Sequence, residues 1–216
     1  MTPGAWQLPD PRRAPAGVEL LALTGRLTPD VALAGYRRGL FAMEVAGGVN
    51  GWFSPDPRGI LPLSRLHISR SLRRSLRRFR VTADQAFDAV VAACADPSRP
   101  GAWINEEYRT VYRALFARGH AHSIEVWSGE RLVGGVFGIE LGGLFCGESM
   151  FHRETDASKV ALAGLVAHLG RAGGAERLLD VQWWTPHLGS LGVVEVPRSD
   201  YLDRVAQALL LPPAFT

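Results

Sequence analysis

The spacing of hydrophobic residues changes along the chain near residue 120. Before this point, apolar residues recur every three or four positions, which is typical of amphipathic helices. After it, residues 122–127, 132–140 and 144–150 are typical of strands, and short turns at 128–130 and 142–143 separate them. The pattern predicts three consecutive strands joined as an antiparallel meander.

Two helices are expected in the first third of the chain. Thr28-Pro29 predicts a helix that runs to Gly39, because threonine caps well and proline suits the first turn. In the second helix, Ile68, Leu72 and Leu76 recur every four residues, and arginines fill the other faces. This pattern predicts an amphipathic helix with a basic outer surface.

Two further helices are expected before the meander. Thr82, with Gln85 three residues later, matches a capping box that would open the third helix. Asn105 is placed to cap the fourth helix, because two glutamates and an apolar stripe follow it.

The order of elements after the meander predicts the fold class. A helix over 156–169, a buried strand over 178–183 and a helix capped by Ser199 are expected there. This succession predicts an α+β fold with a mixed sheet. The proline-rich residues 1–62 are expected to form a small N-terminal domain, and residues 63–216 the main domain.

Composition limits the class of protein further. The chain has 216 residues, 47% of them hydrophobic and 21% charged, which fits one large domain with a small appendage. Cys94 and Cys146 form no CxxC pair, and the six histidines show no metal-binding spacing. No stretch matches a signal peptide, a membrane span, a Walker loop or a dinucleotide fingerprint. We therefore expect a cytoplasmic protein without membrane partners, with a monomer as the default state.

The positive charge is concentrated in one place. The net charge is only +3, but residues 65–80 contain no acidic residue. The arginines of this stretch are Arg65, Arg70, Arg73, Arg74, Arg77, Arg78 and Arg80. Such a cluster is typical of a surface that binds a phosphate backbone, although it could also be only a solvated face.

Asp180 and Gln182 are candidates for chemistry. Their spacing predicts that both side chains lie on one face of a mostly apolar strand. A buried carboxylate beside an amide costs free energy unless it is paired or used. The pair could position and deprotonate a nucleophile, or Asp180 could be a structural residue satisfied by an arginine or a backbone N–H.

Other candidates lie near the predicted strand ends and loops. Glu148 stands among apolar residues at the end of a strand and could bind an ammonium group or lie on the wet side of the sheet. Trp52, Phe53, Trp103 and Tyr112 could stack on an unpaired base, although aromatic residues more often fill cores.

Taken together, these motifs resemble the leucyl/phenylalanyl-tRNA–protein transferase family. The matching stretches include Trp52-Phe53-Ser54-Pro55-Asp56-Pro57-Arg58, Phe145-Cys146-Gly147-Glu148-Ser149-Met150-Phe151 and Asp180-Val181-Gln182. Residues 36–41, 66–71, 119–127, 156–159, 187–192 and 197–198 also match. The matches follow the family order and span nearly the whole chain.

The resemblance implies a fold and an activity. The implied main domain has the N-acetyltransferase-like (GNAT) fold, used without a cofactor. The implied enzyme moves Leu or Phe, with Met as a further candidate, from aminoacyl-tRNA to proteins that begin with Arg or Lys. The new N-terminal residue would mark these proteins for degradation.

The resemblance also assigns roles to residues. Asp180 and Gln182 match the proposed catalytic pair, and Glu148 matches a carboxylate of the aminoacyl pocket. The remaining substrate-binding matches are Trp52, Trp103, Tyr112, Phe145, Met150, Val136 and Leu165. The tRNA-binding matches are Arg70, Arg73, Arg74, Arg77 and Arg78.

Two alternatives remain open from the sequence. The order of elements also fits an acetyl-CoA-dependent N-acetyltransferase, but residues 152–159 lack the glycine turn that would hold the pyrophosphate. A noncatalytic RNA-binding module would use the basic helix alone. The chain departs from the family pattern at Ala42, Met43, Phe53 and Trp183-Trp184, so the choice between Leu and Phe stays open.

Overall fold

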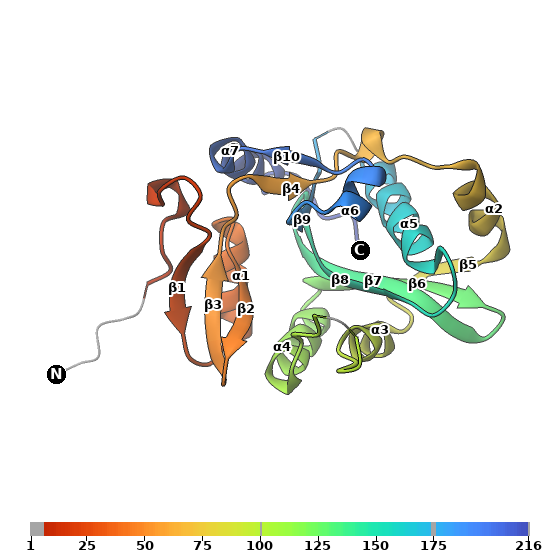
Figure 1. Cartoon of the computed structure of the whole chain (residues 1–216), viewed down its shortest axis with the longest axis horizontal. Coiled ribbons are helices and arrows are strands. Elements are labelled where there is room, and N and C mark those ends of the chain that lie inside the picture. The colour runs from red at the N-terminus through yellow and green to blue at the C-terminus, as the bar shows by residue number, and fades with distance from the viewer. Residues whose placement is uncertain (1–6, 100, 174–175, 216) are drawn as a thin grey trace.

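A seven-stranded mixed sheet forms the centre of the protein in a computed structural model, which describes residues 7–99, 101–173 and 176–215 (Figure 1). The strand order is β10-β4-β9-β8-β7-β6-β5. The bounds are Arg58–Ile60 (β4), Arg80–Ala83 (β5), Ala121–Ser128 (β6), Arg131–Leu141 (β7), Leu144–His152 (β8), Leu178–Gln182 (β9) and Val194–Val196 (β10). The predicted α+β class with a mixed sheet is confirmed.

A second, three-stranded sheet lies at the N-terminal end of the molecule (Figure 1). It has the order β1-β3-β2, with β1 at Leu20–Thr24, β2 at Phe41–Ala46 and β3 at Val49–Phe53. Helix α1 (Pro29–Arg37) packs against it, and Thr28 accepts a hydrogen bond from the Val31 N–H as the predicted cap. Short 3₁₀ turns, η1 (Pro11–Arg13) and η2 (Leu63–Arg65), flank this region.

Helices cover both faces of the large sheet (Figure 1). Helix α5 (Ala157–Arg171) packs on one face, whereas α3 (Phe87–Cys94) and α4 (Glu106–Ala117) pack on the other. The remaining helices are α2 (Arg70–Arg78), which packs on α5, α6 (Pro186–Ser190) and α7 (Arg198–Ala208). Each face of the sheet therefore has its own hydrophobic core, as burial of apolar surface requires.

One pair of strands determines where the functional residues lie. All neighbours in the large sheet are antiparallel except β8 and β9, which are parallel and connected through α5. Their pairing covers three positions, Leu144 with Leu178, Phe145 with Leu179 and Cys146 with Asp180. The pairing of the two strands ends at Cys146 and Asp180, so the residues that follow on each strand lie just beyond the end of this pairing.

The structure confirms the predicted meander and most predicted helices, but it corrects two caps. Thr82 lies in β5, where its hydroxyl bonds Glu125, and α3 has Ala86 as an N-cap with no side-chain bond. The expected capping box at Thr82 is therefore wrong. Ser199 is also not a cap, because α7 already begins at Arg198. The cap at Asn105 is confirmed, since its side chain accepts the Tyr108 N–H at 3.1 Å.

The expected boundary at residue 62 stays a prediction, but one pairing bears on it. Strand β4, which precedes this boundary, pairs with β9 and β10 of the large sheet rather than with the small sheet. The chain therefore passes from β3 of the small sheet to β4, the second strand from one edge of the large sheet. No helix within the described residues is long and apolar enough to cross a membrane.

Gly138 on β7 offers a test of the packing around the bulged region of the sheet. A Cβ atom there would overlap the carbonyl oxygen of Cys146 and the ring of Phe145. We expect Gly138→Ala to lower the free energy of unfolding by about 1–3 kcal/mol, as overpacking does. Gly170→Ala is the control, because its Cβ would meet nothing within 4 Å in α5. Equal denaturant midpoints for the two variants would contradict this account.

Candidate functional site

Glu148 is aimed by an irregularity in the sheet. Along β7 and β8, Phe137 pairs with Ser149 and Gly138 pairs with Gly147, so Glu148 is the extra residue of a β-bulge. A bulge re-aims one side chain out of the regular alternation. Glu148 therefore points to the face covered by α1 and α4, just past the point where β8 leaves β9.

Two tyrosine hydroxyls hold the half-buried Glu148 carboxylate. Tyr36 of α1 donates to Oε1 at 2.8 Å, and Tyr112 of α4 donates to Oε2 at 2.6 Å. Burial raises the pKa of Glu148 to about 7, and the two phenol bonds limit this rise. A carboxylate whose charge is balanced by neutral donors alone is suited to take up an ammonium group.

Asp180 is fully buried and fully bonded. Arg58 donates to its two oxygens through Nε at 2.8 Å and Nη2 at 2.6 Å, and Tyr201 donates to Oδ2 at 2.9 Å. The backbone N–H of Gln182 donates to Oδ1 at 2.9 Å. Asp180 and Arg58 are 0% exposed. Donors therefore surround the Asp180 carboxylate. Such a carboxylate is better placed to hold its neighbours in position than to accept a proton from a substrate.

Gln182 lies beside Asp180 in an unusual backbone conformation. Its φ is 61°, in the left-handed region that residues with side chains avoid. Its backbone N–H is held by Asp180, whereas its side-chain amide bonds no other described residue. Glu148 and Gln182 each lie two residues beyond the last paired position of β8 and β9. The two functional groups therefore lie at the same end of the β8–β9 pairing.

Trp183, which follows Gln182, ties the end of β9 to the small sheet. Its indole N–H donates to Glu19 at 3.0 Å. Its ring packs edge-on against Phe41 and Phe53, with centroid distances of 4.9 and 5.8 Å. Phe53 and Trp183, two positions at which the chain differs from the family pattern, thus belong to one aromatic cluster between the two sheets.

The other predicted aromatics lie on the α4 side of the site. Trp103 is half-buried and packs edge-on against Tyr108, at 5.0 Å between centroids, and Tyr108 leads to Tyr112. Trp52 is 0% exposed beneath α1, and its indole donates to Thr24 at 3.0 Å. Tyr112 therefore contacts Glu148 directly, and Trp103 is linked to Tyr112 through the ring of Tyr108. Trp52 supports this region from inside the core. Contact of Trp52 with an aminoacyl-adenosine end stays a prediction.

The four predicted apolar pocket residues lie on the other face of the sheet. Phe145, Val136 and Leu165 are buried in the core beneath α5, and Met150 packs against the same core while half-buried. The structure does not bring them beside Tyr36 and Tyr112. They belong to a different core from Tyr36 and Tyr112, and their role in binding a substrate stays a prediction.

The predicted basic helix is present as α2 and presents its arginines to solvent. Arg70, Arg73, Arg74 and Arg77 are exposed and line one hollow. Arg78 is exposed as well, but it forms an ion pair with Glu154. Ser75 of α2 bonds Asp156 at 3.0 Å, which fixes the helix to the start of α5.

Three residues of the site were not singled out from the sequence. Arg58 neutralises Asp180, Tyr201 donates to the same carboxylate, and Tyr36 bonds Glu148. Arg58 and Tyr36 lie within stretches that resemble the family, which is the signal that could have found them. Tyr201 lies in the last expected helix, and no local pattern reveals its distant partner.

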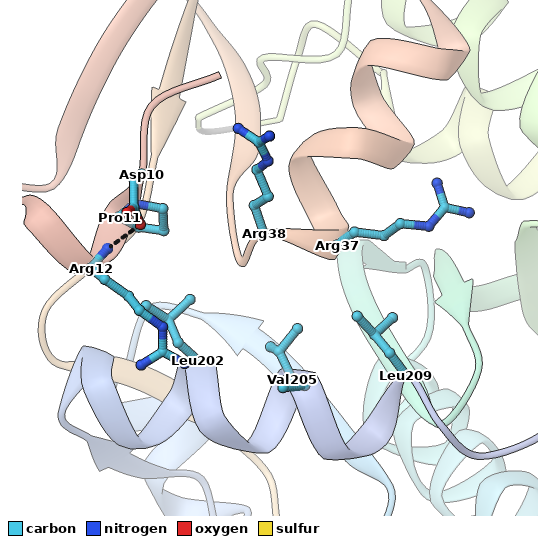
Figure 2. Close-up of a pocket in the computed structure, with 9 residues that line it drawn as sticks. Asp10, Pro11, Arg12, Arg37, Arg38, Leu202, Val205 and Leu209 are labelled. Atoms are coloured by element: carbon cyan, nitrogen blue, oxygen red, sulfur yellow. Dashed lines mark hydrogen bonds between the residues drawn. The ribbon is translucent and has the colours of Figure 1, made fainter. Parts of the chain in front are cut away.

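A cleft lies apart from these residues, between η1, the end of α1 and α7. Figure 2 shows its floor of Leu202 and Val205 on α7 and Leu209 just after it, with Arg37 and Arg38 at its rim. The two guanidinium groups point away from each other and do not converge on a common centre. None of the predicted site residues lines this cleft, so it carries no chemistry that we can assign.

The donor set of the site does not match a metal centre. Within the part of the chain that the structure describes, no group of three or more His, Cys, Asp or Glu residues could hold a metal ion. Both cysteines are buried free thiols. Burial raises the pKa of Cys146 well above its ordinary value, which keeps this thiol protonated and unreactive.

Comparison with known proteins points to one family. The family model of leucyl/phenylalanyl-tRNA protein transferases matches residues 60–206. A leucyl/phenylalanyl-tRNA–protein transferase of Novosphingobium aromaticivorans is 51% identical over 84% of this chain and 71% of its own length. The one of Rhizorhabdus wittichii is 52% identical over 85% of this chain and 75% of its own length.

Solved structures give only a distant likeness. A functionally unknown conserved protein of Staphylococcus epidermidis aligns with a TM-score of 0.41 and 14% identity. The alignment covers 66% of this chain and 57% of that protein. A likeness of this size adds nothing to the assignment.

Proposed function

The chain belongs to the leucyl/phenylalanyl-tRNA–protein transferase family, and we infer that it is an aminoacyltransferase that moves Leu or Phe from charged tRNA to the N-terminus of a protein. The acceptors begin with Arg or Lys, and the product is marked for degradation by its new first residue. Its partners are therefore aminoacyl-tRNA and an acceptor protein. The relatives favour neither of the two alternatives, a CoA-dependent acetyltransferase and a noncatalytic RNA-binding module.

One observation supports the placement of the reaction. Glu148, held by Tyr36 and Tyr112, and the unbonded amide of Gln182 both lie at the end of the β8–β9 pairing. The carboxylate binds the α-ammonium of the donor aminoacyl group, which places the ester carbonyl beside Gln182. Trp103, which packs on Tyr108 next to Tyr112, contacts the adenosine end.

The reaction requires little acid–base catalysis from the enzyme. The C–N bond forms as the acceptor amine attacks the ester carbonyl, and the C–O bond to the ribose breaks. The amine loses one proton and the ribose oxygen gains one, so no net proton comes from the protein. Since the donor is already an activated ester, orientation of the two substrates supplies most of the rate.

Gln182 is the residue that stabilises the developing negative charge. The backbone N–H of Gln182 donates to Asp180, and that of Trp183 donates to the Val181 carbonyl at 2.8 Å. Both are therefore occupied, which leaves the Gln182 side-chain amide as the donor for the oxyanion. A preorganised donor of this kind contributes about 2.7–4 kcal/mol to the transition state.

The arginines of α2 bind the phosphate backbone of the tRNA. Arg70, Arg73, Arg74 and Arg77 surround one hollow. Within the described residues, these four form no ion pair, unlike Arg78. Their charges are therefore available to the phosphates, which release bound cations when the protein binds.

Charge reversal tests this surface. We expect Arg73→Glu, Arg74→Glu and Arg77→Glu together to weaken binding of all tRNAs. The log–log salt dependence should become less steep by about 0.9 for each phosphate that the variant no longer neutralises. Affinity is measured by filter binding from low to physiological salt. The matched control reverses Arg26, Arg37 and Arg38, which are exposed and form no ion pair within the described residues. They lie just before, in and just after α1, which is far from α2 (Figure 1). Equal slopes in the two triple variants would show that α2 is only a solvated face.

A direct assay tests the activity. Radiolabelled leucine is charged on tRNA, and its transfer to a peptide that begins with Arg is measured, with a peptide that begins with Ala as control. We expect label in the first peptide only. Consumption of acetyl-CoA without transfer from tRNA would instead support the acetyltransferase alternative.

Several finer assignments belong to this proposal. The N-acetyltransferase-like fold is supported by the parallel pair β8 and β9, which is joined through α5 within an otherwise antiparallel sheet of the described residues. A division of the chain at residue 62, a monomeric state and a place in the cytoplasm, where charged tRNA occurs, are proposed with it. The catalytic roles of Asp180 and Gln182 are part of the same proposal.

A further inference from the structure

The conformation of Gln182 is costly and is held by a buried set of bonds. A φ of 61° is favoured by glycine and disfavoured by residues with a Cβ atom. Gln182 is 9% exposed, and its backbone pairs with Gly59 of β4, where the register shifts. Strained backbone of this kind persists only where the surroundings enforce it.

Asp180 provides this enforcement. Its Oδ1 accepts the Gln182 N–H at 2.9 Å, which fixes the peptide unit that precedes the left-handed residue. The same carboxylate accepts two bonds from Arg58 and one from Tyr201. Four donors fill the lone pairs of the carboxylate, so it cannot turn to release Gln182.

Arg58 and Tyr201 are themselves immobilised. The Arg58 guanidinium lies over the rings of Phe41 and Tyr201, 4.8 and 4.3 Å from their centroids. Arg58 also donates to the Tyr201 hydroxyl at 3.2 Å, and this hydroxyl donates onward to Asp180. All three side chains are 0% exposed, although they come from β4, β9 and α7. Three elements that are distant in the chain therefore supply the side chains that hold the backbone N–H of Gln182.

We propose that Arg58 and Tyr201 are positioning residues that act through Asp180 to hold Gln182 in its left-handed conformation, with its amide placed at the end of the β8–β9 pairing, where Glu148 also lies. This inference rests on the proposed function, because it assumes that the amide contacts the reacting ester. It assigns the buried ion pair a role in orientation rather than in proton transfer. The strain in the Gln182 backbone is the conformational free energy required to place its amide there.

The strain is tested by a pair of substitutions at one position. At an unstrained site alanine stabilises a fold relative to glycine, whereas at a left-handed site the order reverses. We expect Gln182→Gly to melt roughly 2–4 °C above Gln182→Ala, a difference suited to a chain of this size. Both variants lose the amide, so both should lose transfer activity by roughly 100-fold. A higher melting temperature for Gln182→Ala than for Gln182→Gly would show that the backbone at this position is not strained.

The positioning role is tested by a double-mutant cycle. Tyr201→Phe removes one donor from Asp180 with little change of shape, and we expect a fall of about 10-fold in kcat with an unchanged KM for charged tRNA. In the Gln182→Ala background, the same substitution should change kcat little, because the group it positions is gone. Arg58→Lys lacks the planar fork that donates from two nitrogens to the two oxygens of Asp180, so it should follow the same pattern with a larger single effect.

The cycle has a matched control. Tyr108→Phe removes a similarly buried hydroxyl, which donates to Asn50 at 2.6 Å and does not touch Asp180. Its effect on kcat should be the same with and without the Gln182 amide. Independent, additive effects of Tyr201→Phe and Gln182→Ala would reduce Arg58 and Tyr201 to structural residues. Failure of the unaltered protein to transfer leucine would refute the proposed function itself, a separate outcome.

Discussion

Replacing Asp180 by asparagine is expected to lower turnover by 100-fold or more while the affinity for charged tRNA stays nearly unchanged. Asparagine cannot neutralise the buried Arg58 guanidinium, and its amide would present a donor where Arg58, Tyr201 and the Gln182 N–H all donate. The oxyanion donor at Gln182 would then be misaligned, and loss of one such donor costs about 100- to 1000-fold in kcat.

The same substitution should weaken the fold. Removal of one partner from a buried ion pair costs about 3–5 kcal/mol, because the other charge is left unpaired. Denaturant unfolding measures this effect on stability, and single-turnover transfer from charged tRNA measures the chemistry. The double variant Asp180→Leu with Arg58→Met removes both charges, so it should regain much of the stability without regaining activity. Full activity in the refolded double variant would show that the ion pair does not position the site.

Glu148→Gln is expected to lower kcat/KM for charged tRNA by roughly 100-fold, because a neutral amide cannot hold the donor ammonium as a carboxylate does. In the unaltered protein, burial raises the pKa of Glu148 to about 7. The carboxylate is then protonated as the pH falls through 7, and kcat/KM for charged tRNA should fall with it. This limb of the pH profile should be absent in Glu148→Gln.

Tyr112→Phe provides the companion measurement. The Tyr112 bond lowers the pKa of Glu148 and so opposes the effect of burial. Its removal should move the limb to higher pH.

The free energy of unfolding should depend on the same titration of Glu148. Since the folded pKa lies above the ordinary value of about 4.3, the favourable contribution of protonated Glu148 is complete below that value and is lost as the pH rises through 7. Glu148→Gln should flatten this slope. An unchanged limb in both variants would exclude Glu148 as its source.

Much of the local structure could be predicted because it depends on neighbours in the chain. The caps at Thr28 and Asn105, the three strands of the meander and the basic helix all follow from spacing and turn residues. The misplaced capping box at Thr82 shows the limit. The sequence pattern is present, but pairing of β5 with β6 places Thr82 in a strand, where it bonds Glu125 instead.

The site depended on information that local patterns do not contain. Period-two spacing placed Asp180 and Gln182 on one face, yet the left-handed turn at Gln182 and the bulge at Glu148 break that alternation. The bulge arises from the register of β8 against β7, and the turn from the bond to Asp180. Both are set by partners elsewhere in the fold.

The sequence by itself determined the family, the α+β class, the basic helix and the identity of the polar residues, because these are written in residue types and short spacings. Only the tertiary structure decided that Asp180 is closed off by Arg58 and Tyr201, which stand 122 positions before it and 21 after it. It also decided that the Glu148 carboxylate accepts hydrogen bonds from two phenols on different helices. Hydrogen bonds and burial depend on distance in space, and folding brings such residues together whatever their separation in the chain.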